Sequence, residues 1–363
     1  MLSASSIAKT WVAKAWAQFL RTALFSGLAA LCAGGLTACN GGRHRVLEIN
    51  YVSAPQATLR DQVSYVYSRL GTVKNGDRVE VLEHEKRFSR VRTTSGVEGW
   101  IEDRYLVSQA TYDGLQKLTQ ENQSDPVQAP AILRNETNLH LTPGRETEHL
   151  YQLPAGARVA VLKRATAEKQ PGSIPLTIKP ARLGTKATKA PPGSVLEDWF
   201  LVRDSENRVG WVLARMVDLD IPLDVAQYAE GQRFVAFFVL NQVRDEAKEG
   251  ADKNVAQYLC AITEPHDGLP YDYDQIRIFT WNARKHRYET AYREHGLNGF
   301  LPITVTSENF DKEGTLPVFI LRVKNDNGKI SERKYKLNTP IVRRVLAPGE
   351  QKESPKPASR RRH

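Results

Sequence analysis

The chain has 363 residues, more than one ordinary domain holds and a comfortable length for two or three. Its formal net charge is +10, but residues 163–196 carry a net +6 and residues 351–363 a net +4, so that the remainder sums to −3 once residues 1–38 are set aside. Because a nucleic-acid partner needs a basic patch on a folded face, this distribution argues against nucleic-acid binding.

The first 38 residues have the layout of a secretory signal. Lys9, Lys14 and Arg21 are their only charged residues, and an uncharged stretch, TALFSGLAALCAGGL, follows them. This stretch is shorter than the ~20 apolar residues of a membrane-spanning helix, and small residues close it. We therefore predict a signal peptide over 1–38 and an exported protein.

Cys39 closes the string LTAC, which resembles the lipobox of bacterial lipoproteins. The resemblance implies that the Cys39 thiol receives a diacylglycerol and that cleavage follows just upstream, so that lipid anchors the protein to the cell membrane. Asn40 then resembles the pattern sorted to the outer membrane, at its periplasmic face, in Gram-negative bacteria. The alternative is an ordinary cleaved signal in which Cys39 stands by chance.

Two strings containing Gly-Trp indicate an internal repeat. GVEGWIEDRYL at 96–106 aligns with NRVGWVLARMV at 207–217 at an offset of 111, whereas VEVL at 79–82 aligns with VAVL at 159–162 at an offset of 80. Offsets that differ by 31 indicate one duplicated unit with a 31-residue insertion in its second copy. The insertion, at about 165–196, is rich in Pro, Gly, Lys and Thr, and we expect it to be a long exposed loop.

Each copy has the pattern of a small β-barrel. GDRVEVLE and ARVAVLK are apolar runs of strand length, and FSRVRTTSGVEGWIE and WFLVRDSENRVGWVL each read as two strands around a polar turn. Five short strands in roughly sixty residues are typical of a small barrel.

In order along the chain, these strings resemble a bacterial Src-homology-3 (SH3) domain. An aliphatic strand leads into Leu-Arg in YVSAPQATLR, Gly-Asp-x-Val-x-Val-Leu appears in NGDRVEVLE, and Gly-Trp with a Tyr-Leu pair appears in GWIEDRYL. The second copy matches less fully. We predict such domains at 51–107 and 131–220, and the resemblance implies recognition of peptidoglycan through its peptide stems or cross-bridges.

The aromatic residues of the two copies divide into two groups. We predict four as ligand contacts: Phe88, its aligned partner Trp199, Tyr67, and Tyr105 at the end of the last motif. Trp100 and Trp211 follow the repeated glycine, and we expect a structural role for them, because a large ring buries much apolar area in a small core.

Two departures from the family pattern limit this prediction. Glu102 and Leu213 replace the proline that helps eukaryotic relatives to build a polyproline groove, so such a groove is not expected. In the alignment of the two copies, Met216 of the second takes the place of Tyr105 of the first. We therefore predict that the two copies do not bind alike.

The remaining segments are a linker, a β-rich region and a tail. The linker, 108–130, places Tyr112, Leu115 and Leu118 at helical spacing and predicts a short amphipathic helix packed on a barrel. Residues 228–346 contain about eight antiparallel strands separated by turn signals. The tail, 347–363, is basic and expected to be disordered. The predicted fold is mainly β, with two small SH3-like barrels in tandem and then an antiparallel β-sandwich-like domain.

The sequence contains few residues that could form a catalytic site. Cys260 lies in the apolar run YLCAIT, where a buried inert thiol is expected. His266, His286 and His295 are scattered, without zinc-ligand spacing. The loop 264–275 is crowded with carboxylates, but no spacing matches an oxygen cage, and we expect a solvated loop rather than a weak cation site. No nucleotide-binding or nucleophile-elbow motif occurs, so we expect no catalytic residue, metal or cofactor.

The sequence therefore favours a non-catalytic, lipid-anchored envelope protein that binds the cell wall. The main alternative is an envelope scaffold or assembly protein whose barrels bind protein partners. A third hypothesis, to which less weight is given, is an enzyme with an unrecognised active site in 228–345.

Overall fold

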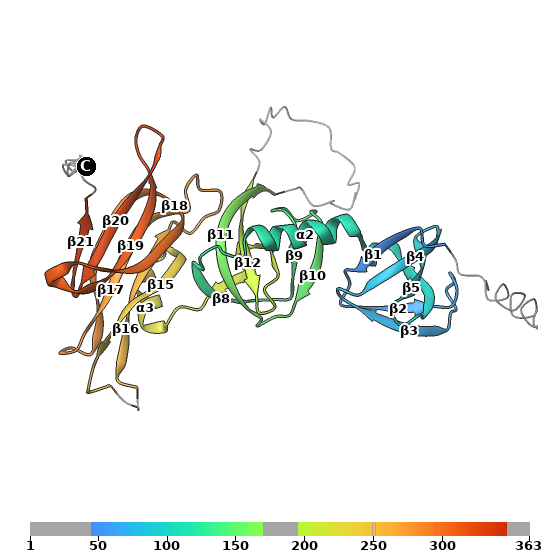
Figure 1. The fold of residues 1–363 in the computed structure, drawn as a ribbon, viewed down its shortest axis with the longest axis horizontal. Coiled ribbons are helices and arrows are strands. Elements are labelled where there is room, and N and C mark those ends of the chain that lie inside the picture. Colours follow the sequence, from blue (N-terminus) through green and yellow to red (C-terminus); the bar gives the residue numbers. More distant parts are fainter. Residues whose placement is uncertain (1–44, 170–194, 249, 251, 347–363) are drawn as a thin grey trace, which may run out of the picture. The chain divides into compact units, whose positions relative to one another are not determined.

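The computed structural model describes residues 45–169, 195–248, 250 and 252–346 (Figure 1). The predicted signal peptide, Cys39, most of the predicted insertion and the basic tail lie outside the described residues. Within the described part the chain is mainly β and forms three seven-stranded sheets in which all neighbouring strands are antiparallel. No helix in this part is long and apolar enough to cross a bilayer.

The first sheet has the order β3-β2-β6-β5-β4-β1-β7, and among the described strands no pairing of β7 with β3 closes it into a hydrogen-bonded barrel. Alternating apolar residues of the strands meet in one core, which includes Val52, Leu59, Val81 and Ile101. The strands and the 3₁₀ turn η1 are β1 (Glu48–Val52), β2 (Gln56–Arg60), β3 (Arg69–Lys74), β4 (Arg78–Glu85), β5 (Phe88–Thr93), β6 (Glu98–Glu102), η1 (Asp103–Tyr105) and β7 (Leu106–Ser108).

The second sheet repeats this order, as β10-β9-β13-β12-β11-β8-β14. Its elements are β8 (Ala129–Leu133), β9 (Thr137–His140), β10 (His149–Leu153), β11 (Arg158–Glu168), β12 (Leu196–Asp204), β13 (Val209–Leu213), the 3₁₀ turn η2 (Ala214–Met216) and β14 (Val217–Leu219). β11 and β12 stay paired as far as Glu168 and Leu196, so the ends of the predicted loop at about 165–196 are strand.

The repeated glycine is explained by close approach of two strands. A Cβ atom on Gly99 would lie 2.9 Å from the Leu59 Cβ, and one on Gly210 would lie 2.6 Å from the Leu139 Cβ. Atoms this close must shift, so both sheets need a residue without a side chain where β6 meets β2 and where β13 meets β9.

The helix α2 (Gln109–Glu121) lies where the linker spacing predicts it. Ser108 caps it by accepting a hydrogen bond from the Thr111 N–H. Its buried Leu115 contacts residues of both flanking sheets, including Tyr51 and Leu150. The Tyr112 ring stacks on that of Tyr51 with centroids 4.0 Å apart, so the helix packs between the two sheets.

The third sheet is a meander with strands in consecutive order from β15 to β21. Its elements, with the short helices before and within it, are α3 (Leu223–Ala226), η3 (Gln227–Ala229), β15 (Arg233–Arg244), β16 (Asn254–Thr263), β17 (Tyr273–Asn282), β18 (Arg287–Asn309), η4 (Asp311–Glu313), β19 (Thr315–Lys324), β20 (Ile330–Asn338) and β21 (Ile341–Val345). One cluster of buried residues contains side chains from every strand from β15 to β20. The single sheet therefore forms this core with its own inner face, whereas a sandwich has two separate sheets that face each other.

Two predicted strands of this region, HRYETAYRE and GFLPITV, form the single 23-residue strand β18. The sequence predicts a turn between them at Asn298-Gly299. In the structure the strand continues through both residues, and Pro302, which cannot donate to a ladder, lies at a register shift between Phe300 and Thr304.

Candidate functional site

A groove of about 760 Å³ opens on the first sheet, a volume within the usual range of ligand sites. It is bounded by the loop 61–68 after β2, by the β4–β5 turn, and by the junction of β6 with η1. Four basic and two acidic side chains line it with aromatic, aliphatic and hydroxyl groups: Arg60, Val63, Ser64, Tyr65, Lys86, Arg87, Phe88, Glu102, Asp103 and Arg104.

The loop 61–68 forms one wall and is held by its own hydrogen bonds. The Asp61 N–H donates to the Ser68 carbonyl oxygen at 3.1 Å, and the Ser68 N–H donates to Asp61 Oδ1 at 2.7 Å. At its tip the Tyr65 side chain is fully exposed. An aromatic side chain presented on a closed loop can contact a ligand with little further ordering.

Arg60 lies at the centre of the groove in a fixed position. Its guanidinium lies 4.3 Å from the Tyr67 ring centroid and 5.1 Å from that of Phe88. It also donates to Glu102 Oε1 at 2.9 Å, while Arg104 Nε lies 2.8 Å from the other oxygen of Glu102. Glu102 is therefore already engaged by two arginines.

The second carboxylate of the groove is engaged as well, because Asp103 Oδ1 accepts a hydrogen bond from the Ser89 hydroxyl at 2.6 Å. Lys86 and Arg87, in the β4–β5 turn, are exposed, and their side chains make no ion pair with another described residue. The groove thus offers two unpaired cations beside two aromatic walls, Tyr65 and Phe88.

The ligand residues predicted in the first copy lie at this groove. Phe88 lines it, and Tyr67 holds Arg60 from the opposite side. Tyr105 lies one residue beyond the lining, where its hydroxyl accepts a hydrogen bond from Arg104 at 2.7 Å while the residue packs against the core. Arg60 and Tyr65 were not predicted as ligand contacts, although the Leu-Arg pair of the family motif and the two tyrosines of VSYVYS pointed to this part of the chain.

Trp100 differs from its expected place. It is half-buried on the outer face of β6, paired in register with Arg60 and Arg90, while the core positions of this strand are Gly99 and Ile101. Because side chains alternate along a strand, the glycine that enters the core forces the following tryptophan outward.

Trp211 also points to the outer face of its strand, β13, but here other side chains cover that face. It packs against a small cluster formed by Leu162, Leu201 and Val209, to which Leu118 of α2 also belongs. It therefore has a packing role between the second sheet and the linker helix.

Trp199 does not fit the ligand role predicted for it, because only 2% of the residue is exposed. Its ring meets the edge of His140, with centroids 5.3 Å apart. His140 pairs with Trp211 as Arg60 pairs with Trp100, so the second sheet has a histidine where the first has its central arginine. Burial, followed by the neighbouring charge of His149, lowers the pKa of His140 to about 4.

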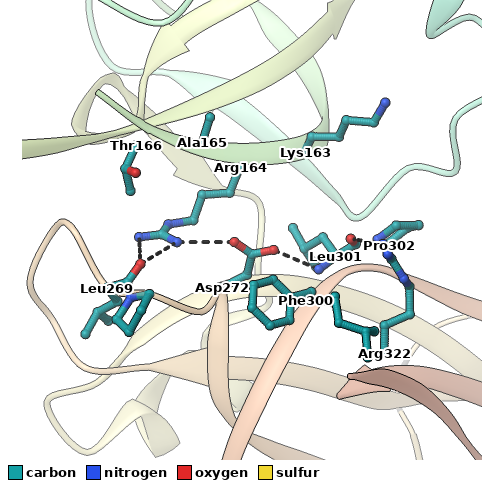
Figure 2. Close-up of a pocket in the computed structure, with 12 residues that line it drawn as sticks. Lys163, Arg164, Ala165, Thr166, Leu269, Asp272, Phe300, Leu301, Pro302 and Arg322 are labelled. Atoms are coloured by element: carbon teal, nitrogen blue, oxygen red, sulfur yellow. Dashed lines mark hydrogen bonds and ion pairs between the residues drawn. The ribbon is translucent and has the colours of Figure 1, made fainter. Parts of the chain in front are cut away.

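A second cavity, of about 440 Å³, lies where the second sheet meets the third (Figure 2). Arg164 of β11, 3% exposed at its side chain, donates to the carbonyl oxygen of Tyr271 at 2.8 Å and pairs with Asp272 at 3.2 Å. The other Asp272 oxygen accepts from the Leu301 N–H at 2.8 Å. Both terminal nitrogens of Arg164 are engaged, while its buried Nε has no hydrogen-bond partner among the described residues. The contact forms a structural seam between the two sheets, and Arg164, which the sequence analysis counted with the basic stretch 163–196, is a buried residue of that seam.

Three of the four carboxylates in the loop 264–275 form ion pairs, whereas Asp274 Oδ1 is buried without a hydrogen-bond partner among the described residues. Glu264 pairs with His266 at 2.9 Å, and Asp267 pairs with Arg233 at 2.7 Å. In the part of the chain that the structure describes, no group of three or more His, Cys, Asp or Glu is arranged to hold a metal ion. Cys260 is fully buried in an apolar cluster, and burial raises the pKa of its thiol well above the ordinary value.

Residues 56–107 match the family model of the bacterial SH3 domain, so the groove lies within an SH3 domain of bacterial type. No curated protein matches the chain.

Solved structures that share similarity with the chain include three proteins of the NlpC and NlpC/P60 type. They are NlpC2 from Trichomonas vaginalis (12% sequence identity, covering 84% of this chain and 97% of that chain, TM-score 0.16), an NlpC/P60 family protein from Bacillus cereus ATCC 10987 (10%, 80% and 95%, TM-score 0.22) and NlpC1 from Trichomonas vaginalis (11%, 84% and 93%, TM-score 0.15). At these TM-scores the likeness implies nothing about activity.

Proposed function

We propose that this is a non-catalytic protein of the cell envelope whose first SH3 domain binds the peptide part of peptidoglycan. The observation that carries the proposal is the groove beside Arg60, which lies within the matched segment 56–107 and presents exposed aromatic and cationic side chains. Such a mixture suits a peptide, whose backbone and side chains offer apolar and charged groups together.

A non-catalytic role is supported by the state of the described cysteine. A nucleophilic cysteine needs an exposed thiolate. Cys260 is fully buried among apolar side chains, and its raised pKa keeps the thiol protonated.

We further propose that the second sheet is a diverged copy of the same domain and that lipid on Cys39 holds the protein at the membrane. The shared strand order supports the first point, and the lipobox-like LTAC supports the second. A Cys39→Ala variant should leave the membrane fraction and become soluble in the envelope. Unchanged partitioning would contradict lipidation.

Sedimentation with purified peptidoglycan sacculi tests the proposed function. The chain without residues 1–38 should sediment with sacculi, and Tyr65→Ala should weaken binding about five- to thirtyfold, as expected for truncating an aromatic contact worth 1–2 kcal/mol. Leu223→Ala is the matched control, because Leu223 is also a strongly exposed apolar side chain but lies far along the chain from the groove.

A protein that stays in the supernatant while it captures defined envelope proteins would contradict wall binding. That result would favour the scaffold alternative.

A further inference from the structure

The two related sheets carry opposite charges at aligned positions of the sequence, just before the aromatic residue of β5 and of β12. Phe88 pairs with Glu102 across β5 and β6, and Trp199 pairs with Leu213 across β12 and β13. The residue before the aromatic is Arg87 in the first sheet and Asp198 in the second. One residue further back, Lys86 of the first sheet corresponds to an acidic residue, Glu197, of the second.

In the second sheet these acidic positions are already filled by arginines of the same chain. Arg145, from the loop between β9 and β10, donates from Nε to Glu197 at 2.7 Å. This loop corresponds to the loop 61–68 of the first sheet, since each follows the strand that carries Arg60 or His140. The ion pair thus joins the β9–β10 loop to β12, whereas in the first sheet the corresponding loop 61–68 and the β4–β5 turn are separated by the groove.

Asp198 receives the third sheet in a similar way. Its side chain is fully buried and accepts hydrogen bonds from Arg164 at 2.6 Å, Arg233 at 2.5 Å and the Gly268 N–H at 3.0 Å. Burial alone would raise the pKa of Asp198, but these donors outweigh it and hold the pKa below its ordinary value. Asp198 is therefore neutralised by Arg164 of its own sheet and by Arg233 of β15, and the loop 264–272 adds one backbone donor.

At the aligned positions the first sheet has Lys86 and Arg87, which form the turn between β4 and β5 and line its open groove. Arg87 and Lys86 are exposed, and no described carboxylate pairs with either. The two carboxylates nearby are already engaged: Glu102 by Arg60 and Arg104, and Asp103 by the Ser89 hydroxyl. The positive charges of Arg87 and Lys86 therefore make the first groove complementary to an anionic group.

We propose that the groove of the first sheet binds a peptide segment that bears free carboxylates, with Arg87 and Lys86 as the carboxylate contacts and Tyr65 and Phe88 as apolar walls. The second groove is closed by the chain itself and takes no ligand. This inference rests on the proposed function, because wall peptides with free carboxyl groups are the intended ligand. Guanidinium groups also bind phosphate, so the experiment must separate carboxylates from phosphodiester-linked wall polymers.

Sacculi in three forms provide that test: untreated, stripped of phosphodiester-linked polymers with hydrofluoric acid, and amidated at their carboxyl groups with carbodiimide and ammonia. Acid stripping should leave binding unchanged, and amidation should lower it about tenfold or more, as expected for loss of a charged partner. Arg87→Glu should lower binding to untreated sacculi by a similar factor and have little effect on amidated sacculi. The control is Arg284→Glu, an equally exposed arginine in the β17–β18 turn.

Equal binding before and after amidation, or a loss only after acid stripping, would overturn the inference while leaving wall binding intact. A second measurement tests carboxylate recognition separately from wall binding: an NMR titration with a soluble stem peptide and with its amidated form. Shifts at Tyr65 and Phe88 with the acid form only would support the inference even if no sacculi were bound. Equal shifts with both forms, or none, would overturn it.

Discussion

Arg60 and His140 occupy equivalent places, paired in register with Trp100 and Trp211. Arg60 forms an ion pair with Glu102 at 2.9 Å. His140 is largely buried, faces His149 and Thr147, and has a pKa lowered to about 4. The second sheet has therefore replaced an ion-paired arginine with a group that is neutral at pH 7.

This difference predicts an acid-sensitive second sheet. Because the folded pKa of His140 lies below its unfolded value of 6.5, its neutral form stabilises the fold above pH 6.5, and that contribution is lost as pH falls from 6.5 toward 4. Urea unfolding should show a loss of about 2 kcal/mol between pH 7.5 and 5 from this group. His140→Gln should remove most of the loss. The control is His266→Gln, because His266 is exposed and its pKa is raised, so that its contribution to stability changes with pH in the opposite direction. An unchanged pH profile in His140→Gln would contradict this assignment.

At the scale of elements, α2 determines how the first two sheets hold together. Leu115 is buried against Tyr51 of the first sheet and Leu150 of the second. The Asn75 side chain adds a direct bond between the sheets, because its Nδ2 donates to the Leu150 carbonyl oxygen at 2.6 Å. The helix is therefore part of a shared core and not a free linker.

Shortening the central side chain of the helix tests this packing. Leu115→Ala should lower the free energy of unfolding by about 2–4 kcal/mol, since a buried leucine loses both its transfer free energy and its packing. Lys117→Ala, in the same helix, removes an exposed i,i+4 pair with Glu121 and should cost no more than about 0.5 kcal/mol. Chemical unfolding followed by circular dichroism measures both. A loss below 1 kcal/mol for Leu115→Ala would show that the helix does not share the cores.

For the whole molecule, Asp198 is one of the buried residues that join the second and third sheets, together with Arg164. Asp198→Ala would leave Arg164 buried without one of its carboxylates and Arg233 with only Asp267, and breaking a buried pair in this way costs about 3–5 kcal/mol. We expect a lower unfolding temperature and earlier proteolysis between the two sheets.

Asp218→Ala is the matched control, because Asp218 forms an exposed ion pair with Arg134 that should contribute at most about 1 kcal/mol. Differential scanning calorimetry with limited proteolysis compares the two variants. Equal melting temperatures for both would contradict a seam centred on Asp198.

The sequence by itself determined the repeat, the strand-rich character, a helix within 108–130 and a bacterial SH3 pattern over 51–107, because these depend on local periodicity and short motifs. The helix lies at Gln109–Glu121, the family model matches 56–107, and the strand order of the first sheet recurs in the second. The sequence also located the aromatic residues Phe88 and Tyr67 that lie at the groove.

Only the tertiary structure decided which of these residues face solvent. Trp100 faces outward because Gly99 must enter the core, and Trp199 is buried with the His140 ring against it. The partners of Asp198 in the third sheet, Arg233 and Gly268, lie 35 and 70 positions from it in the sequence. No local pattern records such contacts, since they arise only when separate sheets pack together.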